Sequence, residues 1–575
     1  MGVIHMRAVS VSSNQHRPVT LPLVVALANH ILKEIHFTEW IDTRVQWDPT
    51  QWRVSPGILA KAMVLATFSD MRAPLVHVSS RFAGMDTEYL FGDGISSAEI
   101  NEYNLGQMLD RLSEKDCNEL YRSMALTVST IYQIIIRRLH ADTTSVSFYG
   151  EYDMDLNQLS EAERAEILAI DRGYNKDGRP QCNQIVVGQI VNEDGIVLAS
   201  EVMDGHTSDI DWNRRAIEYV RVIQQGISQS GIFVADSKLV CEEHFRNLCD
   251  PESRIEFVSR CPANFGRKLE SRMIQKAYAQ GDWQELGSYH DGKSASVYQG
   301  ISFTESVYGY PTRLLVVRSS SLAGKVDQQI EKERLVAAGL VKDLEKKTFK
   351  CIPDVKEEWQ RFSNNKNTRL FTCHYGIETQ SEEKWPRGRR GPDTQPIGME
   401  TSYRIKVTDI VENPDTAGLF RQTESCFVII GNVSKTVDDQ QLLGIYKGQQ
   451  IVENSFQLLK DPCLASVIYL KNENRIRALT MLLSLSLLIR SIIQYRMRQG
   501  LRAYTEQNPE TPLKAGWGHK KLEAPTFKLL FEYCRNNFYL RTGPEDYSFN
   551  FHSADNEFLV TTLLSLMNLT VSDLI

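Results

Sequence analysis

The chain has 575 residues and a formal net charge of -7, so it is too long for one hydrophobic core and several domains are expected. Its hydrophobic fraction of 42% and charged fraction of 24% are ordinary for a soluble globular protein. The longest apolar run, 478–489, is shorter than the roughly 20 residues that a membrane-spanning helix needs, and no secretory signal opens the chain, so a cytoplasmic protein without membrane contact is expected.

Sequence motifs argue against several further classes of protein. The ten cysteines contain no Cys-x-x-Cys pair and no zinc-finger spacing. Neither a Walker A sequence nor a dinucleotide fingerprint is present, which disfavours ATP-driven and redox enzymes. The mildly acidic balance disfavours a nucleic-acid partner only weakly, because phosphate contacts depend on where the positive charges lie.

Residues 1–136 are expected to form a compact helical domain. The stretch from Leu21 to Ile41 has apolar residues at helical spacing. Ser55 followed by Pro56 is typical of a helix start, with the serine as N-cap and the proline in the first turn. Such a domain can recognise DNA ends or merely pack against its neighbours, and the sequence leaves both interpretations open.

Residues 137–289 change to an alternation of strands and helices. Strands are predicted at 138–149, 183–191, 196–203, 231–235 and 255–259, and helices at 211–225 and from Ser237. The second and third strands form a hairpin, because Asp194-Gly195 is a typical tight turn. This order of elements is the one expected of an RNase H-like α/β core.

The remainder divides into a β-rich insertion, 290–435, and a helical completion of the core, 436–575. The insertion mixes predicted strands at 314–318, 369–374, 403–410 and 426–430 with a charged helix around 326–347. Residues 382–392 are polar with proline and glycine, and predict an exposed loop.

Two aspartates occupy the positions where open α/β sheets place their sites. Asp142 lies in the first predicted strand, and Asp236 ends the short apolar strand at 231–235. In an RNase H-like sheet these strands are neighbours, so the two carboxylates would repel each other unless a cation such as Mg²⁺ or Mn²⁺ lay between them. Asp236 could equally be the N-cap of the helix that follows.

A third carboxylate lies on a segment predicted as one helix, 446–460. Tyr446, Glu453 and Lys460 are spaced seven residues apart and would share one helical face, beside Gln449. On spacing alone, this stripe is either a functional face or the solvated side of an amphipathic helix.

At this point the chain resembles a known group of proteins. Tyr446, Glu453 and Lys460 match the Tyr-x2-Arg-x3-Glu-x6-Lys helix of the IS4 superfamily of insertion-sequence transposases, with Gln449 in the place of arginine. Further segments resemble its IS1634 family: 90–92, 104–110, 205–209 (with His206 for asparagine), 460–462, 469–471 and 475–479. The resemblance covers essentially the whole chain, and its specificity lies in the ordered combination of motifs.

The resemblance implies a DDE transposase that cuts DNA at the element ends and joins them to target DNA. Asp142, Asp236 and Glu453 would be the catalytic triad and the ligands of two Mg²⁺ or Mn²⁺ ions. The site for DNA phosphates would include Tyr446 and Lys460. The family arginine would bind a DNA phosphate with two hydrogen bonds. Since glutamine lacks the charge of arginine, Gln449 would weaken phosphate binding at this point unless Lys447 compensates. The implied partners are double-stranded DNA, as terminal inverted repeats and target, and a second copy in a homodimer.

Two other interpretations stay open beside the active transposase: a DNA-binding protein that no longer cuts, and an RNase H-like nuclease of other purpose. Positive charges cluster at 471–502 and at Arg387, Arg389 and Arg390, where they could track DNA phosphates or form a solvated face. An aromatic wedge for an extruded base would come from Trp283, Trp359 or Trp385, each of which could instead be structural.

Overall fold

The chain forms two compact units. The first unit combines residues 1–257 with 447–575, and the second unit is the intervening segment 258–446. The computed structural model describes residues 18–69, 77–148, 168–227, 231–252, 254–263, 265, 268–291, 294–388, 391, 395–460, 472–543 and 546–575. The four segments expected from the sequence are thus grouped into two units, and the first unit is discontinuous along the chain.

The N-terminal part of the first unit is mostly helical. Its helices are α1 (Leu23–Glu34), α2 (Phe37–Asp42), α3 (Pro56–Ala66), α4 (Val78–Arg81), α5 (Thr87–Phe91), α6 (Glu102–Ser113) and α7 (Cys117–Ile131), with the 3-10 turn η2 (Ser97–Glu99). Ser55 is the N-cap of α3, because its side chain accepts a hydrogen bond from the backbone N–H of Ile58 at 3.3 Å. The predicted start of this helix is therefore confirmed.

A small sheet joins the two ends of the first unit. Strand β1 (Val19–Pro22) pairs antiparallel with β14 (Phe538–Arg541), which pairs with β15 (Tyr547–Asn550). The sequence predicted helical segments at both ends of the chain, and the structure adds these three short strands to them. Strand pairing across more than 500 residues leaves no local pattern, because each strand has only four residues.

Four strands of the first unit form the part of the main sheet that carries the candidate site. They are β2 (Arg138–Phe148), β3 (Asn183–Asn192), β4 (Val197–Met203) and β5 (Ile232–Val234), in the order β4-β3-β2-β5. Strand β3 pairs antiparallel with both β2 and β4, while β5 runs parallel to β2. The predicted hairpin and the predicted neighbourhood of the first and fourth strands are confirmed.

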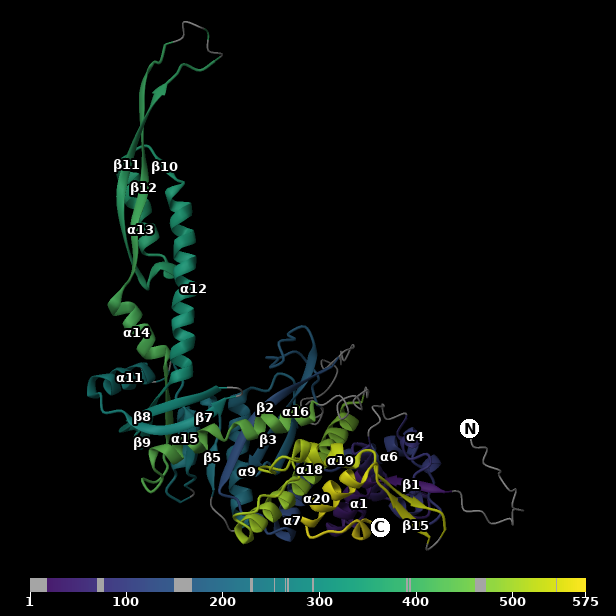
Figure 1. The fold of residues 1–575 in the computed structure, drawn as a ribbon. Helices are drawn as coiled ribbons and strands as arrows, with labels where there is room; N and C mark the ends of the chain where they lie inside the picture. The colour runs from purple at the N-terminus through teal and green to yellow at the C-terminus, as the bar shows by residue number, and fades with distance from the viewer. Residues whose placement is uncertain are drawn as a thin grey trace. The chain divides into compact units, whose positions relative to one another are not determined.

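Helices cover both faces of these strands. Gly188 of β3 faces α9 (Asp209–Ile227) so closely that a Cβ there would lie 2.4 Å from the Trp212 ring. The opposite face is covered by α16 (Gln450–Leu459), whose Ser455 donates to Gln189 Oε1 at 2.8 Å, and by α18 (Glu473–Gln507), whose Ser484 hydroxyl lies 2.9 Å from that of Ser200. The layers are visible in Figure 1.

Helix α18 is the long core helix of the first unit. Among the described residues it alone is long and apolar enough to cross a membrane, but 94% of its most apolar window is buried inside the protein. The helices α10 (Glu242–Cys249), α19 (Phe527–Cys534) and α20 (Ala554–Ser565) and the 3-10 turns η4 (Ser237–Leu239), η6 (Trp517–His519) and η7 (Val571–Leu574) complete the unit.

The second unit has its own strands, in the order β6-β13-β9-β8-β7. Their bounds are β6 (Phe257–Arg260), β7 (Gln284–Asp291), β8 (Ser294–Val307), β9 (Tyr310–Ser319) and β13 (Cys426–Gly431). Strand β13 pairs antiparallel with β6 and with β9. The helices α11 (Leu269–Gln280) and α15 (Asp439–Lys447) also belong here, although Lys447 itself is assigned to the first unit.

A long hairpin dominates the rest of the second unit. Strands β11 (Phe371–Lys384) and β12 (Gly398–Glu412) pair antiparallel, and β10 (Thr348–Phe349) pairs with β12. Helix α12 (Ser320–Glu345) runs beside this hairpin, with α13 (Ile352–Ser363), α14 (Pro414–Glu424) and η5 (Lys366–Thr368) around it (Figure 1). Residues 382–384, expected in a loop, extend β11, because their backbone pairs with β12.

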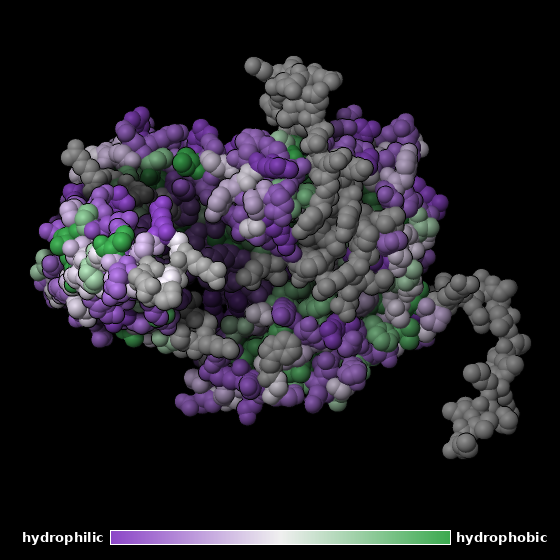
Figure 2. All heavy atoms as spheres, turned by 90° about the horizontal axis from the view of Figure 1, so that it is seen from above, coloured by the Kyte–Doolittle hydropathy of each residue, from purple (hydrophilic) through white to green (hydrophobic). Residues whose placement is uncertain are grey.

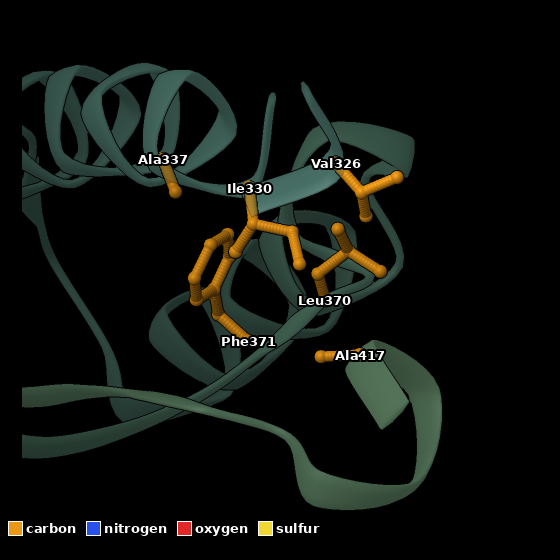
Figure 3. Packing of buried hydrophobic residues seen from close by; sticks show 6 residues of the cluster. All are labelled: Val326, Ile330, Ala337, Leu370, Phe371 and Ala417. Carbon is orange, nitrogen blue, oxygen red and sulfur yellow. The ribbon is translucent and has the colours of Figure 1, made fainter. Parts of the chain in front are cut away.

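Apolar contacts hold α12 against the hairpin base. Ile330 of α12 is 3% exposed and packs with Phe371 and Leu370 at the start of β11 (Figure 3). Apolar positions on one side of α12 thus serve the core, although Leu335 and Val336 of the same helix are exposed. The molecular face in Figure 2 is mostly hydrophilic, and the exposed large hydrophobic residues are scattered, with Tyr174 (86% exposed) the most exposed among those described.

The segment 446–460 is not one helix, contrary to the expectation. Helix α15 ends at Lys447 and α16 begins at Gln450, so Gly448 and Gln449 form a turn between them. Glycine is a poor helix former, and the Gln449 side chain donates to the Ala141 carbonyl of β2 at 2.9 Å. Because of this break, the seven-residue spacing does not place Tyr446 on the face of Glu453.

A buried lysine in α3 gives a prediction about stability and pH. Lys61 is 7% exposed, and its ammonium donates to the Leu90 carbonyl at 2.5 Å. Burial lowers its pKa from 10.5 to about 8, so between these values the unfolded chain binds more protons than the folded one. The free energy of unfolding should therefore gain on the order of 3 kcal/mol from this group as pH rises from about 8 to 10.5.

The test compares urea unfolding of wild type and Lys61→Met at about pH 7 and about pH 10. Between the lower and the higher pH, the free energy of unfolding of the wild type should rise relative to that of Lys61→Met. The reason is that methionine has no proton to lose. Lys115→Met, at an exposed position, is the matched control and should track the wild type. A pH-independent difference between wild type and Lys61→Met would contradict the prediction.

Candidate active site

Asp142 lies in the middle of β2, on the sheet face covered by α16. It is paired across the ladder with Gln189, the residue that Ser455 of α16 contacts. Its side chain is 23% exposed, and its Oδ1 accepts a hydrogen bond from the Thr143 backbone N–H at 2.7 Å. Burial raises the pKa of Asp142, while the nearby Lys176 ammonium opposes the rise.

Asp236 follows the neighbouring strand β5. The parallel register pairs His140 with Val234, so two further residues along each chain bring Asp236 next to Asp142. Asp236 Oδ1 accepts from the Lys238 backbone N–H at 3.1 Å and from Asn213 Nδ2 at 3.0 Å. It is thus the N-cap of η4, as one interpretation of the sequence expected, and at the same time a neighbour of Asp142.

The electrostatics of Asp236 reflect this crowding. Burial raises its pKa to about 6, and the negative charges of Asp209 and Asp142 contribute to the rise. Because its ionised form is disfavoured, a nearby positive charge would stabilise the Asp236 carboxylate. Perturbed carboxylates in this position are candidates for function on physical grounds.

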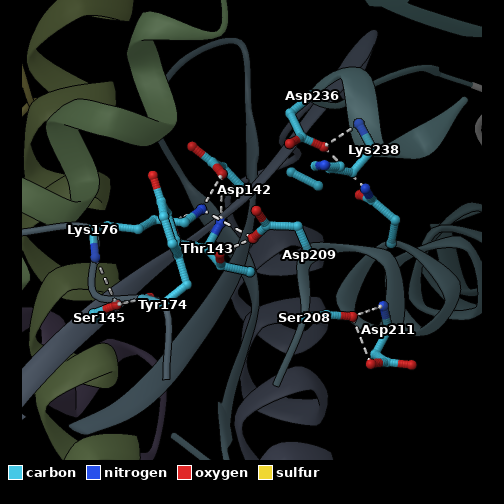
Figure 4. Close-up of polar contacts among 12 residues, drawn as sticks. Asp142, Thr143, Ser145, Tyr174, Lys176, Ser208, Asp209, Asp211, Asp236 and Lys238 are labelled. Atoms are coloured by element: carbon cyan, nitrogen blue, oxygen red, sulfur yellow. Dashed lines mark hydrogen bonds and ion pairs between the residues drawn. The ribbon is translucent and has the colours of Figure 1, made fainter. Parts of the chain in front are cut away.

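Asp209 and Lys176 complete a cluster that the sequence had not indicated. Asp209 begins α9 and accepts from the Thr143 hydroxyl at 2.6 Å. The Lys176 ammonium lies 3.3 Å from Asp142 Oδ1 and 3.0 Å from Asp209 Oδ1, and donates to the Thr143 carbonyl at 3.0 Å (Figure 4). Burial lowers the pKa of Lys176, but the charges of Asp142 and Asp209 outweigh that effect and raise it overall.

One signal for Asp209 was present in the sequence. It ends the segment 205–209, one of those that resemble the IS1634 family. Lys176 had no such signal, because a lysine in a loop 34 residues from Asp142 is common and its partner depends on the fold.

Helix α16 is fastened beside this cluster at both ends. Gln449, just before the helix, donates to the Ala141 carbonyl, adjacent to Asp142. Lys460, just after it, pairs with Asp177 at 2.5 Å, adjacent to Lys176. Glu453 lies on α16 between these two anchors and is exposed, and its Oε2 accepts from Gln450 Nε2 at 2.8 Å.

The remaining predicted phosphate contacts lie at the unit boundary. The ring of Tyr446, in the second unit, packs against Phe427 with ring centroids 5.9 Å apart. Lys447 is the last residue of α15. The structure therefore groups Gln449, Glu453 and Lys460 with the aspartates in one unit and assigns Tyr446 to the other.

Carboxylate oxygens are the donors that Mg²⁺ and Mn²⁺ prefer. Within the described part of the chain, no group of three His, Cys, Asp or Glu side chains is arranged to hold a metal ion by itself. Mg²⁺ in phosphoryl-transfer sites is commonly held by one or two carboxylates together with substrate phosphates. The donor chemistry of Asp142 and Asp236 on adjacent strands fits that mode.

The basic residues of α18 serve internal contacts. Arg475 pairs with Asp110 at 2.6 Å, and Arg496 pairs with Glu34 at 2.9 Å, so both fasten α18 to the N-terminal helices. Arg490 donates to the Thr67 carbonyl at 2.5 Å and is 8% exposed. Lys471, Arg389 and Arg390 of the predicted basic clusters lie outside the described residues.

Two of the three candidate aromatic wedges are packed within the second unit. Trp359 stacks on Tyr375 with ring centroids 4.1 Å apart. The Trp283 ring lies under the Arg318 guanidinium at 4.5 Å. These contacts fit a structural role for both tryptophans.

Residues 21–126 match a family model described as a domain of unknown function, DUF4277. No curated protein matches the chain. A cryo-EM structure of the piggyBac transposase synaptic complex with hairpin DNA is similar at 8% sequence identity, covering 96% of this chain and 84% of that chain, with a TM-score of 0.34. A TM-score this low does not establish a common fold.

Proposed function

We propose that the chain is a DDE-type DNA transposase whose active site lies in the first unit, with Asp142, Asp236 and Glu453 as its metal-binding carboxylates. The observation that carries the proposal is that Asp142 on β2 lies beside Asp236, which follows the neighbouring parallel strand β5, and that both have a raised pKa. Two such groups disfavour each other's ionisation, and a divalent cation relieves this repulsion. The neighbouring β2 and β5 strands also support an RNase H-like core.

Glu453 is assigned as the third carboxylate because of its helix. The anchors of α16 contact residues adjacent to Asp142 and to Lys176. Glu453 lies on that helix between the two anchors, and its carboxylate is at the surface. The sequence resemblance to the IS4 superfamily points to the same three residues.

The chemistry proposed is phosphodiester hydrolysis at an element end, followed by attack of the freed 3′-hydroxyl on target DNA. Two Mg²⁺ or Mn²⁺ ions held by these carboxylates would activate the attacking oxygen and stabilise the leaving oxygen. The ammonium of Lys176 adds positive charge beside the scissile phosphate, and Lys460 adds another at the end of α16. The partners proposed are double-stranded DNA, as terminal inverted repeats and target, and a second copy in a homodimer.

The test is a cleavage assay on a labelled duplex that carries the flanking element ends. Wild-type protein with Mg²⁺ should nick the element end, and Glu453→Ala should abolish nicking while end binding persists. Glu473→Ala removes a partly exposed acid in the first turn of α18; it is the matched control and should cut like the wild type.

Three other results carry defined meanings. End-specific binding without cutting by either protein would favour a DNA-binding protein that has lost catalysis. Equal cutting by wild type and Glu453→Ala would remove Glu453 from the site. Cutting without preference for element ends would favour a nuclease of other purpose.

A further inference from the structure

The loop 171–182, called here the anchored loop, connects to β3 and lies beside the aspartate cluster. It carries Lys176, whose ammonium contacts Asp142, and Asp177, which pairs with Lys460. It also carries Arg172 and Arg179, both exposed, and Tyr174, which is 86% exposed. Three cations and one exposed aromatic ring therefore lie within eight residues at the candidate site.

The backbone of this loop is held in place by partly buried hydrogen bonds. The Tyr174 carbonyl accepts from Gln184 Nε2 at 3.3 Å and from the Ser145 hydroxyl at 3.4 Å. Asn175 Nδ2 donates to Gln184 Oε1 at 2.8 Å and to the Ser147 hydroxyl at 3.0 Å. These contacts tie both residues to strands β2 and β3.

The residue before the tyrosine is equally constrained. A Cβ on Gly173 would lie 2.1 Å from the Gly205 carbonyl oxygen, so only glycine fits where the two backbones meet. The Tyr174 backbone is thus fixed from both sides while its ring stays in solvent. Among the described residues, its ring forms no aromatic or cation–π pair and its hydroxyl forms no hydrogen bond.

The anchored backbone thus presents the exposed Tyr174 ring to solvent in the same loop as Lys176, which contacts the aspartates. In Figure 4 the Tyr174 side chain extends along Lys176 toward the side where the Asp142 carboxylate lies. Single-stranded nucleic acid is bound by this combination: cations follow the phosphates while aromatic rings stack on the bases. Stacking needs an unpaired base, because the faces of a paired base are covered by its neighbours in the duplex.

We propose that Tyr174 is a stacking platform for an unpaired DNA base next to the scissile phosphate, with the cations of the anchored loop contacting the adjoining phosphates. The proposal rests on the proposed function for the identity of the strand. The aromatic role considered for Trp283 and Trp359 then belongs to a residue of the first unit.

The experiment measures binding without cleavage. Fluorescein-labelled oligothymidylate is titrated with the full chain in EDTA, and the fluorescence anisotropy is followed. Tyr174→Ala should weaken binding by roughly 5- to 100-fold, the range for loss of one base–aromatic stack. Tyr174→Phe should bind like the wild type, because it keeps the ring, and Tyr174→Leu should bind like Tyr174→Ala.

An abasic strand of the same length separates stacking from charge. Wild type and Tyr174→Ala should bind the abasic strand equally, because its phosphates remain and its bases are gone. Phe558→Ala, which removes another exposed ring (53%) on α20, is the matched control and should leave oligothymidylate binding unchanged.

Each contrary result has one meaning. No loss in Tyr174→Ala, an equal loss on the abasic strand, or no binding of oligothymidylate by wild type would overturn the stacking proposal. Ring-dependent binding by a wild type that never cuts DNA with Mg²⁺ would retain the stacking proposal and remove the transposase activity.

Discussion

Asp142→Asn should lower the rate of Mg²⁺-dependent cleavage at an element end by at least about 100-fold, since groups that merely support a metal ligand already cost 10- to 100-fold. The amide keeps an oxygen that accepts from the Thr143 N–H but has no charge to hold a cation. Lys176 keeps Asp209 as a partner at 3.0 Å, so the fold around it should persist. Single-turnover cleavage on a labelled duplex measures the rate.

Asp211→Asn is the matched control for that variant. Asp211 also lies near the cluster, in the first turn of α9, but it accepts from Ser208 and pairs with Arg214 at the surface (Figure 4). Its loss of charge should leave cleavage within about twofold, because surface ion pairs contribute little. Equal losses of cleavage rate in the two variants would mean that the net negative charge of this region, and not the position of Asp142, sets the rate.

Lys176→Met should destabilise the metal-free protein and make its stability respond more strongly to Mn²⁺. Lys176 contacts both Asp142 and Asp209 and is 27% exposed, so its removal leaves two carboxylates without their cation. We expect a loss of about 2 kcal/mol in the free energy of unfolding, less than the ~3–5 kcal/mol for a fully buried pair. Urea unfolding in EDTA, and again in MnCl₂, measures the loss and its recovery.

Lys460→Met provides the comparison. This lysine is also 27% exposed, but it pairs with a single carboxylate, Asp177, which is 33% exposed. Its loss should cost no more than about 1 kcal/mol and should not be recovered by Mn²⁺. If Mn²⁺ stabilises both variants and the wild type equally, the cluster does not bind the ion through the atoms that Lys176 contacts.

The sheet of the first unit was largely predictable because its signals are local. Strands β2 to β5 alternate or form short apolar runs, and an Asp-Gly turn fixes the β3–β4 hairpin. Those strands bring Asp142 and Asp236 together as expected. The roles of the triad, the two ions and the four phosphate contacts stay predictions.

The surroundings of those aspartates were not predictable in the same way. Asp209 and Lys176 approach Asp142 from segments whose sequence describes only a turn and a loop. The break at Gly448 depends on a contact between Gln449 and Ala141, 308 residues apart. Periodicity describes a helix in isolation, whereas this helix ends where its side chains find partners in the sheet.

The discontinuity of the first unit has a consequence for synthesis on the ribosome. Strands β2 to β5 emerge before the second unit, but α16 and α18, which cover one of their faces, emerge only after residue 446. At about 5–20 residues per second, roughly 10–40 seconds pass while the intervening segment is made. During that interval the apolar face of the nascent sheet lacks its cover, so a chaperone that shields it would raise the yield of folded protein.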